Sequence, residues 1–349
     1  LSFHHNMSLI KQVISGDRRA LAQALTLVEN DNQDSQNMLA EVCTHTGHAH
    51  IIGVTGIPGA GKSTLINSLV KFIRKYDDSL GLLAIDPSSK FSKGAILGDR
   101  IRMRDLSGDK DVFIRSMATR GALGGLSFAT AGAVDILDAA GFDRVIVETV
   151  GVGQAEVDIA SNAHTLIVVL CPGVGDSVQT AKSGILEVAD IIVVNKSDYP
   201  EVNATKSYLR EMLDIGSAAR VGLSETENMT HDPHWVTGKL DADNNSWQVP
   251  IVTTNATSGE GVSGLFDNLL AHYDHITSTG EITVRRQNRM RAIFESRLRK
   301  QLYTKFSQML SEDYFLRQLE LMMARETDPY TAVTECMNNF EINYIGDED

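Results

Sequence analysis

Cysteine is scarce in this chain of 349 residues, and the three that occur, Cys43, Cys171 and Cys336, lie far apart. Their number is odd, and their spacing matches neither a disulfide framework nor a zinc site. Isolated thiols of this kind are typical of a protein that stays reduced. The scarcity therefore excludes a small secreted protein held together by disulfides, and we expect a cytoplasmic protein.

The chain also lacks a long apolar run and an excess of basic residues. No stretch of about 18 apolar residues occurs, which argues against a membrane-spanning helix, and no signal-peptide pattern is visible at the start of the sequence. The formal net charge is −13, whereas nucleic-acid binding normally needs a basic face. We therefore expect neither membrane nor nucleic acid as a partner. The hydrophobic content of 42% is enough for a sizeable core.

The clearest motif fits G-x-x-x-x-G-K-[ST], the phosphate-binding P-loop. An apolar, β-branched run at 51–55 leads into it, and a helical pattern at 63–74 follows. Glycines let backbone N–H groups turn toward a triphosphate, and the helix N-terminus adds partial positive charge. We expect the lysine to reach the β- and γ-phosphates and the serine after it to bind Mg²⁺. The residues concerned are Gly56, Ile57, Pro58, Gly59, Ala60, Gly61, Lys62, Ser63 and Thr64.

Apolar strand candidates alternate with helical stretches through the middle of the chain. Their apolar character is continuous and not alternating, which favours a parallel sheet buried on both faces. Ligands of such sheets bind at the carboxyl ends of the strands. We therefore predict an α/β fold of the P-loop NTPase class, with a doubly wound, mostly parallel sheet. The strands are predicted at 51–55, 80–86, 111–116, 144–149, 165–171, 190–195 and 249–254.

Acidic residues follow two of these strands and are candidates for a metal site. Asp86 ends the second strand and Asp99 lies in the segment after it. Either carboxylate suits Mg²⁺, directly or through water, although the Asp-Pro-Ser sequence at 86–88 is equally typical of a simple turn. Glu148 ends an otherwise apolar strand, and Gly151 and Gln154 come after it. In P-loop GTPases an acid and a glycine at such positions meet Mg²⁺ and the γ-phosphate, and mobile glycines here indicate a nucleotide-sensing switch.

A guanine-reading motif, Asn-Lys-x-Asp, ends the sixth predicted strand. Its residues are Asn195, Lys196 and Asp198. A carboxylate at the last position accepts two hydrogen bonds from guanine, which adenine cannot supply, while the asparagine braces the site and the lysine stem covers the base. After the seventh strand, Asn255 and Ala256 occupy the place where a backbone N–H meets the guanine oxygen. We therefore expect GTP and GDP as ligands, together with Mg²⁺.

Helical periodicity continues on both sides of this array. We predict a helical arm at 1–50, with a break at Gly16-Asp17, a GTPase domain at 51–275, and a helical segment at 276–349. The C-terminal segment begins with several arginines and carries two apolar stripes. These stripes favour self-association, and packing on the chain's own GTPase domain is the alternative.

Five motifs taken together resemble the MeaB/ArgK group of P-loop GTPases. They are GIPGAGKST, AIDPSS, GAILGDRIRM, ETVGVGQAEVD and NKSD, in this order, and the resemblance covers nearly the whole chain. The segment after Ser116 departs from the serine- and proline-rich version usual in that group. This departure concerns the surface toward a partner and leaves the nucleotide chemistry unchanged.

The resemblance implies a homodimeric GTPase that acts as a chaperone for an adenosylcobalamin-dependent acyl-CoA mutase, methylmalonyl-CoA mutase. It implies that Lys62, Asp99, Glu148 and Gln154 serve catalysis or switching, with Ser63, Asp86, Asp99 and Glu148 around the metal. A eukaryotic member would act in the mitochondrial matrix. Because Gln154 does not directly follow Gly151, we expect slow intrinsic turnover.

Two other functions remain open at this point. One is a kinase that phosphorylates the binding protein of an amino-acid transport system, an older label for ArgK-type sequences. The other is a nickel-insertion GTPase, which would need a Cys/His cluster. Cys43, His45, His48 and His50 lie close together in the sequence, but short histidine tracts of this kind are usually polar linkers.

Overall fold

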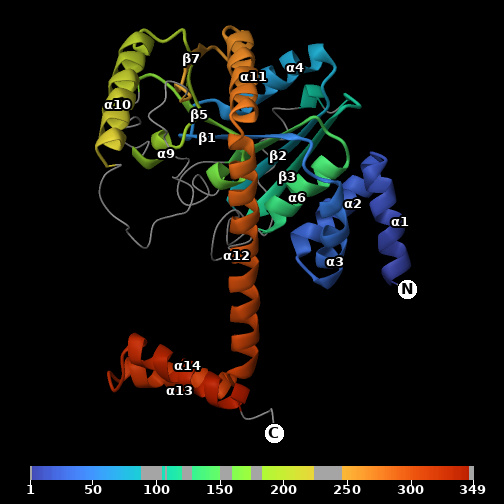
Figure 1. Cartoon of the computed structure of the whole chain (residues 1–349), viewed down its shortest axis with the longest axis vertical. Coiled ribbons are helices and arrows are strands. Elements are labelled where there is room, and N and C mark those ends of the chain that lie inside the picture. The colour runs from blue at the N-terminus through green and yellow to red at the C-terminus, as the bar shows by residue number, and fades with distance from the viewer. Residues whose placement is uncertain are drawn as a thin grey trace. The chain divides into compact units, whose positions relative to one another are not determined.

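A seven-stranded parallel sheet forms the centre of the larger part of the protein (Figure 1). The computed structural model describes residues 2–87, 104–106, 108–119, 128–149, 159–173, 183–223 and 246–345. The chain divides into two compact units, Leu1–Arg291 and Ala292–Asp349. The first unit contains the whole sheet, so the candidate site is described within it.

All seven predicted strands are present, and each neighbouring pair is parallel. Their spatial order is β3-β2-β4-β1-β5-β6-β7. The doubly wound α/β fold is therefore confirmed. β3 continues beyond its predicted end at Ser116 because it pairs with β2 as far as the Pro87–Thr119 rung. The strands are β1 His50–Gly56, β2 Leu80–Pro87, β3 Val112–Thr119, β4 Arg144–Thr149, β5 Thr165–Leu170, β6 Ile191–Asn195 and β7 Ile251–Thr254.

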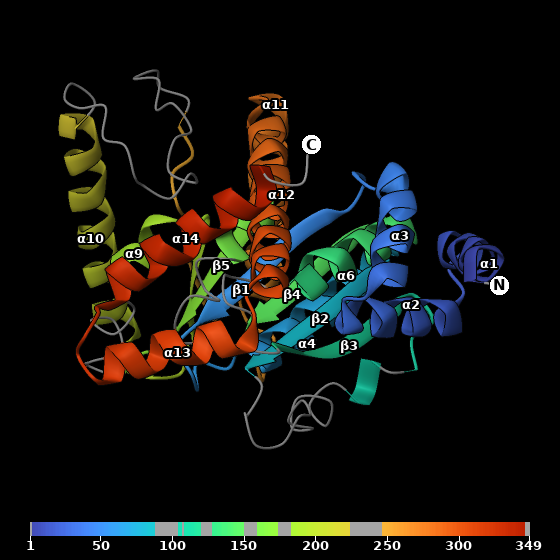
Figure 2. The same cartoon turned by 90° about the horizontal axis from the view of Figure 1, so that it is seen from below.

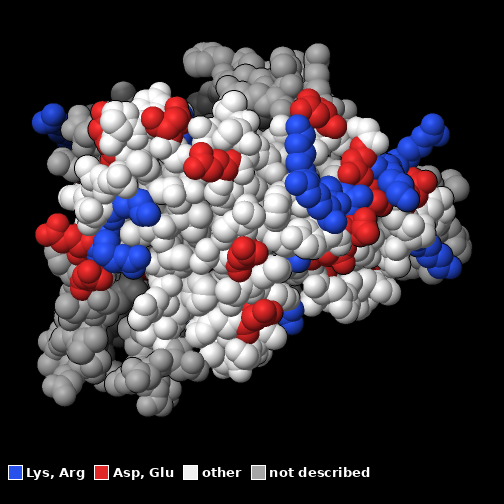
Figure 3. Space-filling model, turned by 90° about the horizontal axis from the view of Figure 1, so that it is seen from above, with Lys and Arg blue, Asp and Glu red and all other residues white. Residues whose placement is uncertain are grey.

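Helices cover both faces of the sheet, which explains the continuous apolar character of the strands. Every residue of β1, β5 and β6 is buried. α4 (Lys62–Ile73) and α11 (Val262–Ser278) lie on one face, and α6 (Phe128–Ala139) lies on the other (Figures 1 and 2). On the side that carries α4 and α11, basic and acidic side chains form small mixed groups with uncharged surface between them (Figure 3). In the chain, α9 (Ser183–Glu187) lies between β5 and β6, and α10 (Val202–Leu223) lies between β6 and β7.

The N-terminal arm forms α1 (Ser2–Ile14), α2 (Arg18–Asn30) and α3 (Gln33–Val42). The predicted break at Gly16-Asp17 is confirmed, since the Asp17 side chain accepts hydrogen bonds from two N–H groups at the start of α2. A second break, after α2, was not predicted. There Asp31 adopts a left-handed conformation, and the Asn32 side chain caps α3 by accepting from Ser35 N.

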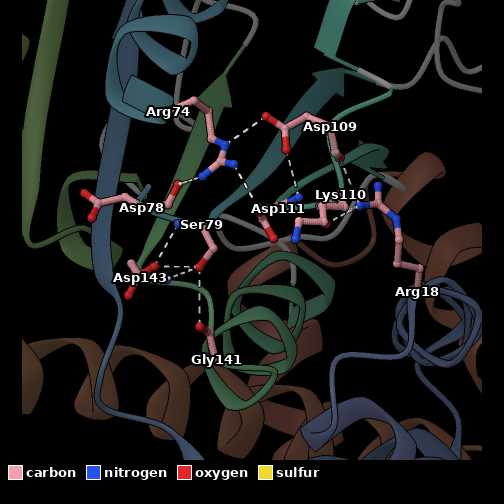
Figure 4. Close-up of polar contacts among 9 residues, drawn as sticks. All are labelled: Arg18, Arg74, Asp78, Ser79, Asp109, Lys110, Asp111, Gly141 and Asp143. Carbon is pink, nitrogen blue, oxygen red and sulfur yellow. Dashed lines mark hydrogen bonds and ion pairs between the residues drawn. The ribbon is translucent and has the colours of Figure 1, made fainter. Parts of the chain in front are cut away.

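Charged and polar side chains join the amino ends of β2, β3 and β4 (Figure 4). The Arg74 guanidinium, in the short 3₁₀ turn after α4, donates to carboxylate oxygens of Asp109 and Asp111 at 2.8 Å each. Ser79 donates to the Asp143 carboxylate through both its N–H and its hydroxyl, at 2.7 Å. These bonds tie the amino ends of three strands together. The 3₁₀ turns are η1 Cys43–His45, η2 Arg74–Tyr76 and η3 Arg104–Leu106.

A buried polar network continues this edge at β1, β5 and β6. The Asp190 carboxylate receives two hydrogen bonds of 2.8 Å from Arg285 and one of 2.8 Å from Leu166 N. Burial alone would raise the pKa of Asp190, but Arg285 and His272 outweigh burial and hold that pKa well below its usual value. The hydroxyl of Thr165 lies 2.9 Å from His272 Nδ1. The network thus keeps a carboxylate charged inside the protein.

Two buried histidines belong to the same edge. His50 Nε2 lies 2.8 Å from the Thr165 hydroxyl, and His164 Nδ1 accepts from Ile51 N at 3.2 Å. Burial, with the nearby Arg286, lowers the pKa of His164 to about 3. Burial and the neighbouring His164 likewise hold the pKa of His50 well below its usual value. Both rings are therefore neutral at physiological pH.

The C-terminal region is helical, as predicted, but it is interrupted twice. α12 (Glu281–Met309), α13 (Glu312–Met323) and α14 (Pro329–Ile345) replace the single helical stretch that the sequence predicted. Ser311 is the N-cap of α13, since its hydroxyl accepts a hydrogen bond from Tyr314 N at 3.2 Å. None of the helices in the described ranges is long and apolar enough to cross a membrane.

Candidate nucleotide-binding site

The loop at 56–61 joins β1 to α4 at the carboxyl edge of the sheet. Two of its glycines are required by their surroundings. A Cβ at Gly56 (φ +135°) would overlap the backbone of Val169 in β5, and a Cβ at Gly61 (φ +89°) would lie 2.6 Å from Asn195 Nδ2. The loop therefore passes close to β5 and β6 with positive φ angles, which glycine readily permits. This conformation brings the N-terminus of α4 to the sheet edge, where helix N-termini bind anions.

Lys62 lies at the start of α4 with its side chain folded back over this loop. Its ammonium group donates to Gly56 O at 2.8 Å and to Ile57 O at 3.1 Å, and the residue is buried. The lysine charge is thus fixed above the backbone that would surround a phosphate group. This geometry suits a P-loop lysine.

Ser63 and Glu148 lie together beside the loop. The Ser63 hydroxyl donates to Glu148 Oε1 at 2.7 Å, and both side chains are buried. Glu148 reaches this point because β4 pairs with β1 in a register that sets it opposite Val54. Asp86 lies near the end of the adjacent strand β2, two positions beyond the rung with Glu148. Hydroxyl and carboxylate oxygens are hard donors, so the Ser63 and Glu148 pair fits Mg²⁺.

No group of three or more His, Cys, Asp or Glu side chains gathers as metal ligands within the described ranges. The described residues thus give no support to a nickel site at Cys43, His45, His48 and His50.

Asn195 connects the phosphate end of the site to the loop after β7. It lies at the end of β6 and is buried, and its Nδ2 donates to Ala60 O in the P-loop at 2.7 Å. Its Oδ1 accepts from the Thr254 hydroxyl at 3.1 Å and from Ala256 N at 3.0 Å. One side chain thus sets the spacing between the two loops that would hold the two ends of a nucleotide.

Lys196 and Asp198 follow Asn195 on an exposed turn. Lys196 adopts a left-handed conformation (φ 59°), and its ammonium lies 5.8 Å from the centre of the Tyr199 ring. Asp198 is exposed and accepts from Asn255 Nδ2 at 3.0 Å. The Asp198 carboxylate therefore lies beside the loop after β7, where a base could be read.

The remaining predicted site residues fall into two groups. Pro58, Gly59, Ala60 and Thr64 lie in the P-loop and the first turn of α4. Asp99, Gly151 and Gln154 lie outside the described residues, as does the side chain of Asp86. The sequence did not indicate Ser68, whose hydroxyl donates to Ala256 O at 2.6 Å. Nothing in the pattern of α4 distinguishes this serine, because the contact depends on the distance between α4 and β7.

The parallel sheet, the P-loop at its carboxyl edge and the Asn-Lys-x-Asp turn on β6 define a P-loop GTPase. Residues 21–310 match the family described as methylmalonyl-CoA mutase-associated GTPase MeaB. The chain belongs to this MeaB family.

Relatives and one solved structure agree with this assignment. One relative is a protein of Pyrococcus horikoshii that is named as a GTPase. The two are 42% identical over 324 residues, which is 93% of this chain and 95% of that protein. The GTPase ArgK of Escherichia coli is 30% identical over 341 residues, covering 96% and 97% of the two chains. A crystal structure of a LAO/AO transport system kinase superposes with a TM-score of 0.65 at 23% identity, covering 97% of this chain and 98% of that one. The last similarity concerns the fold alone.

Proposed function

We propose that this protein hydrolyses GTP to GDP and phosphate with the help of Mg²⁺, and that it serves as a chaperone for an adenosylcobalamin-dependent acyl-CoA mutase. The observation that carries the nucleotide part is Asn195, which bonds to the P-loop and to the loop after β7 at the same time. A phosphate site and a base site with a fixed spacing suit a nucleoside triphosphate. The carboxylate of Asp198 makes guanine the preferred base.

In this proposal, Lys62 turns from the carbonyl groups of Gly56 and Ile57 toward the β- and γ-phosphates. Ser63 and Glu148, with Asp86 and Asp99, would hold Mg²⁺, which would supply positive charge beside the phosphates. Gly151 meets the γ-phosphate through its N–H. Catalysis then comes mainly from positioning and charge stabilisation while water attacks the γ-phosphorus.

We expect intrinsic turnover to be slow. Gln154 is separated from Gly151 by two residues, so it does not occupy the position from which a glutamine orients the attacking water in the Ras type of GTPase. A partner that orders the segments around Gly151 and Gln154 should therefore raise the rate. The family description, which associates its members with methylmalonyl-CoA mutase, supports a mutase as this partner. The chaperone would gate cofactor loading and protect the mutase from inactivation.

We also propose that the chain forms a homodimer through its C-terminal segment, 276–349. The unit Ala292–Asp349 carries several large apolar side chains that are exposed in the single chain. Phe294, Leu298 and Leu302 repeat every four residues on α12, so they share one face of that helix. Exposed apolar patches of this kind mark association surfaces. Analytical ultracentrifugation of the full chain and of a Phe294→Asp, Leu302→Asp variant tests the dimer, since the wild type should be dimeric and the variant monomeric.

Phosphate release from GTP and from ATP, with and without a cobalamin-dependent acyl-CoA mutase, tests the main proposal. We expect GTP to be preferred and the mutase to accelerate its hydrolysis. If the protein hydrolyses GTP slowly and the mutase does not change the rate, the chaperone role is contradicted. The proposal that the protein hydrolyses GTP would still stand. Preference for ATP would contradict the base-reading role of Asp198, and transfer of the γ-phosphate to a protein would indicate a kinase.

The Asp198→Asn variant tests the base site directly. Because an amide cannot accept both guanine hydrogen bonds, the variant should lose affinity for GDP and gain affinity for xanthosine diphosphate. Titration of both nucleotides measures this change. Unchanged GDP affinity would show that Asp198 does not read the base.

A further inference from the structure

The side chain of Asn255 is held in one orientation beside Asp198. Its Oδ1 accepts from Thr257 N at 3.1 Å and from Ser258 N at 3.2 Å. Only an amide oxygen can accept from these N–H groups, so the amide nitrogen must point the other way. There, Nδ2 donates to Asp198 Oδ1 at 3.0 Å. The backbone therefore decides which end of the Asn255 amide faces the carboxylate.

The loop that carries Asn255 is also closed on itself. Asn255 N donates to Glu260 O at 3.0 Å, and Asn255 O accepts from Gly259 N at 2.9 Å. Gly261 (φ +76°) lies so close to β7 that a Cβ there would overlap Thr253 O. The backbone that carries Asn255 is thus held by hydrogen bonds and close packing. Asp198, in contrast, is exposed on the turn after β6. The hydrogen bond from Asn255 therefore restricts the rotamers that the Asp198 side chain can adopt.

Guanine recognition needs this order because both oxygens of Asp198 must lie in the plane of the base, one opposite N1–H and one opposite the amino group. An exposed aspartate without a partner changes rotamer freely, and fixing it costs entropy when the ligand binds. We propose that Asn255 is a positioning residue for guanine selectivity, which holds the Asp198 carboxylate in the orientation that reads both donors. The proposal rests on the base-reading role of Asp198 given above.

Two variants of Asn255 separate this role from a structural one. Asn255→Asp keeps the shape and the two acceptor bonds from Thr257 N and Ser258 N but replaces the donor to Asp198 with a second carboxylate oxygen, which repels it. Asn255→Ala removes all three bonds. The matched control is Asn268→Asp in α11, where the amide donates to Gly264 O at 2.7 Å. The affinities of GDP and of inosine diphosphate, which lacks the amino group, are measured by calorimetry on the full chain, and thermal unfolding checks the fold of each variant.

We expect wild-type protein to prefer GDP over inosine diphosphate by about tenfold, as one hydrogen bond to a charged group predicts. In Asn255→Asp, GDP should bind about tenfold more weakly and the ratio of the two affinities should approach one. Asn255→Ala should lower the ratio in the same direction, and Asn268→Asp should leave both affinities unchanged. The ratio reports orientation because a merely loosened loop weakens both nucleotides equally.

An unchanged ratio in both Asn255 variants would overturn the inference, whether the two affinities fall together or stay as they are. The Asp198→Asn variant distinguishes this failure from a failure of the proposed function. If Asp198→Asn gains xanthosine diphosphate while the Asn255 variants keep the wild-type ratio, only the positioning role is wrong. If Asp198→Asn gains nothing, the base-reading role itself is wrong.

Discussion

The two ends of one parallel sheet are both rich in polar side chains, yet they differ in how those side chains are used. At the carboxyl edge, Lys62 and Asn195 bond to loop backbone, and Asp198 remains exposed. At the amino edge, the buried carboxylate of Asp190 accepts two hydrogen bonds from Arg285. The carboxyl edge presents its charges toward the place where a ligand would bind. At the amino edge, the charged groups pair with one another within the protein.

The difference follows from the direction of the strands. In a parallel sheet every crossover returns the chain to the amino edge, so loops of variable length and helix N-termini gather at the carboxyl edge. Those loops are free to specialise for binding. At the amino edge, Arg74, just after the end of α4, and Arg285, near the start of α12, bond to carboxylates that precede strands. We therefore expect mutations at the carboxyl edge to change nucleotide binding and mutations at the amino edge to change stability.

The largest expected effect is at the carboxyl edge. Lys62→Ala should lower GTP hydrolysis by about a hundredfold to a thousandfold, because it removes a charge that stabilises the transferring phosphate. Phosphate release measures the loss, and the thermal unfolding temperature should stay close to that of the wild type. Lys71→Ala is the control, since Lys71 lies on the same helix and pairs with Asp105 at the surface. Equal activity in the two variants would contradict the site.

At the amino edge, Arg285→Met should lower the free energy of unfolding by about 3 kcal/mol, because it leaves the buried Asp190 carboxylate without its main partner. His272, at 3.2 Å from Asp190, keeps the loss from being larger. Chemical denaturation measures the change. Nucleotide affinity should be preserved, and a variant that loses GDP binding while keeping its stability would contradict a purely structural role for Arg285.

The buried histidines predict a pH dependence that belongs to the amino edge. The pKa of His164 is about 3 in the folded protein, below its unfolded value of about 6.5, so the unfolded chain binds a proton that the folded chain does not. The stability that the neutral, buried His164 contributes is therefore fully present above pH 6.5 and is lost as the pH drops below it. His164 should contribute a slope of about 1.4 kcal/mol per pH unit.

Chemical denaturation between pH 6 and 4.5 measures that slope. His164→Asn keeps an acceptor for Ile51 N and should reduce the slope by about one proton's contribution. The same substitution at His48, which is exposed, is the control. An identical slope in wild type and His164→Asn would show that His164 is not buried in its neutral form.

The smallest expected effect concerns Ser68, which lies on α4 but bonds to the base loop at Ala256 O. Ser68→Ala removes one hydrogen bond, worth about 1 kcal/mol, and should speed GDP release by about fivefold. Stopped-flow dissociation of a fluorescent GDP analogue measures the rate. Thr277→Ala is the control, since its hydroxyl donates to Tyr273 O at 2.7 Å near the far end of α11. An unchanged release rate would show that α4 does not help to hold the loop.

Much of the carboxyl edge was predictable because its chemistry needs particular residue types at fixed spacing. Phosphate binding requires glycines before Lys62, and guanine reading requires an Asn-Lys-x-Asp turn, so both motifs are visible without coordinates. The amino edge was not predictable. Asp190 and Arg285 are far apart in the sequence, and no spacing rule connects a strand start to a helix that begins at 281. The breaks at Asp31-Asn32 and Ser311 were missed although their signals are local, since the Asn32 and Ser311 side chains each accept from an N–H group three residues later.

The seven strands, the P-loop and the residues expected to meet the phosphates and the base could be predicted without the fold, because periodicity and motif spacing are local properties of the chain. The fold was needed to show that Asn195 joins two loops, that Asn255 directs its amide nitrogen at Asp198, and that His50, His164 and Asp190 are buried. Each of these depends on the order of strands in the sheet and on distances between elements, which sequence spacing does not contain.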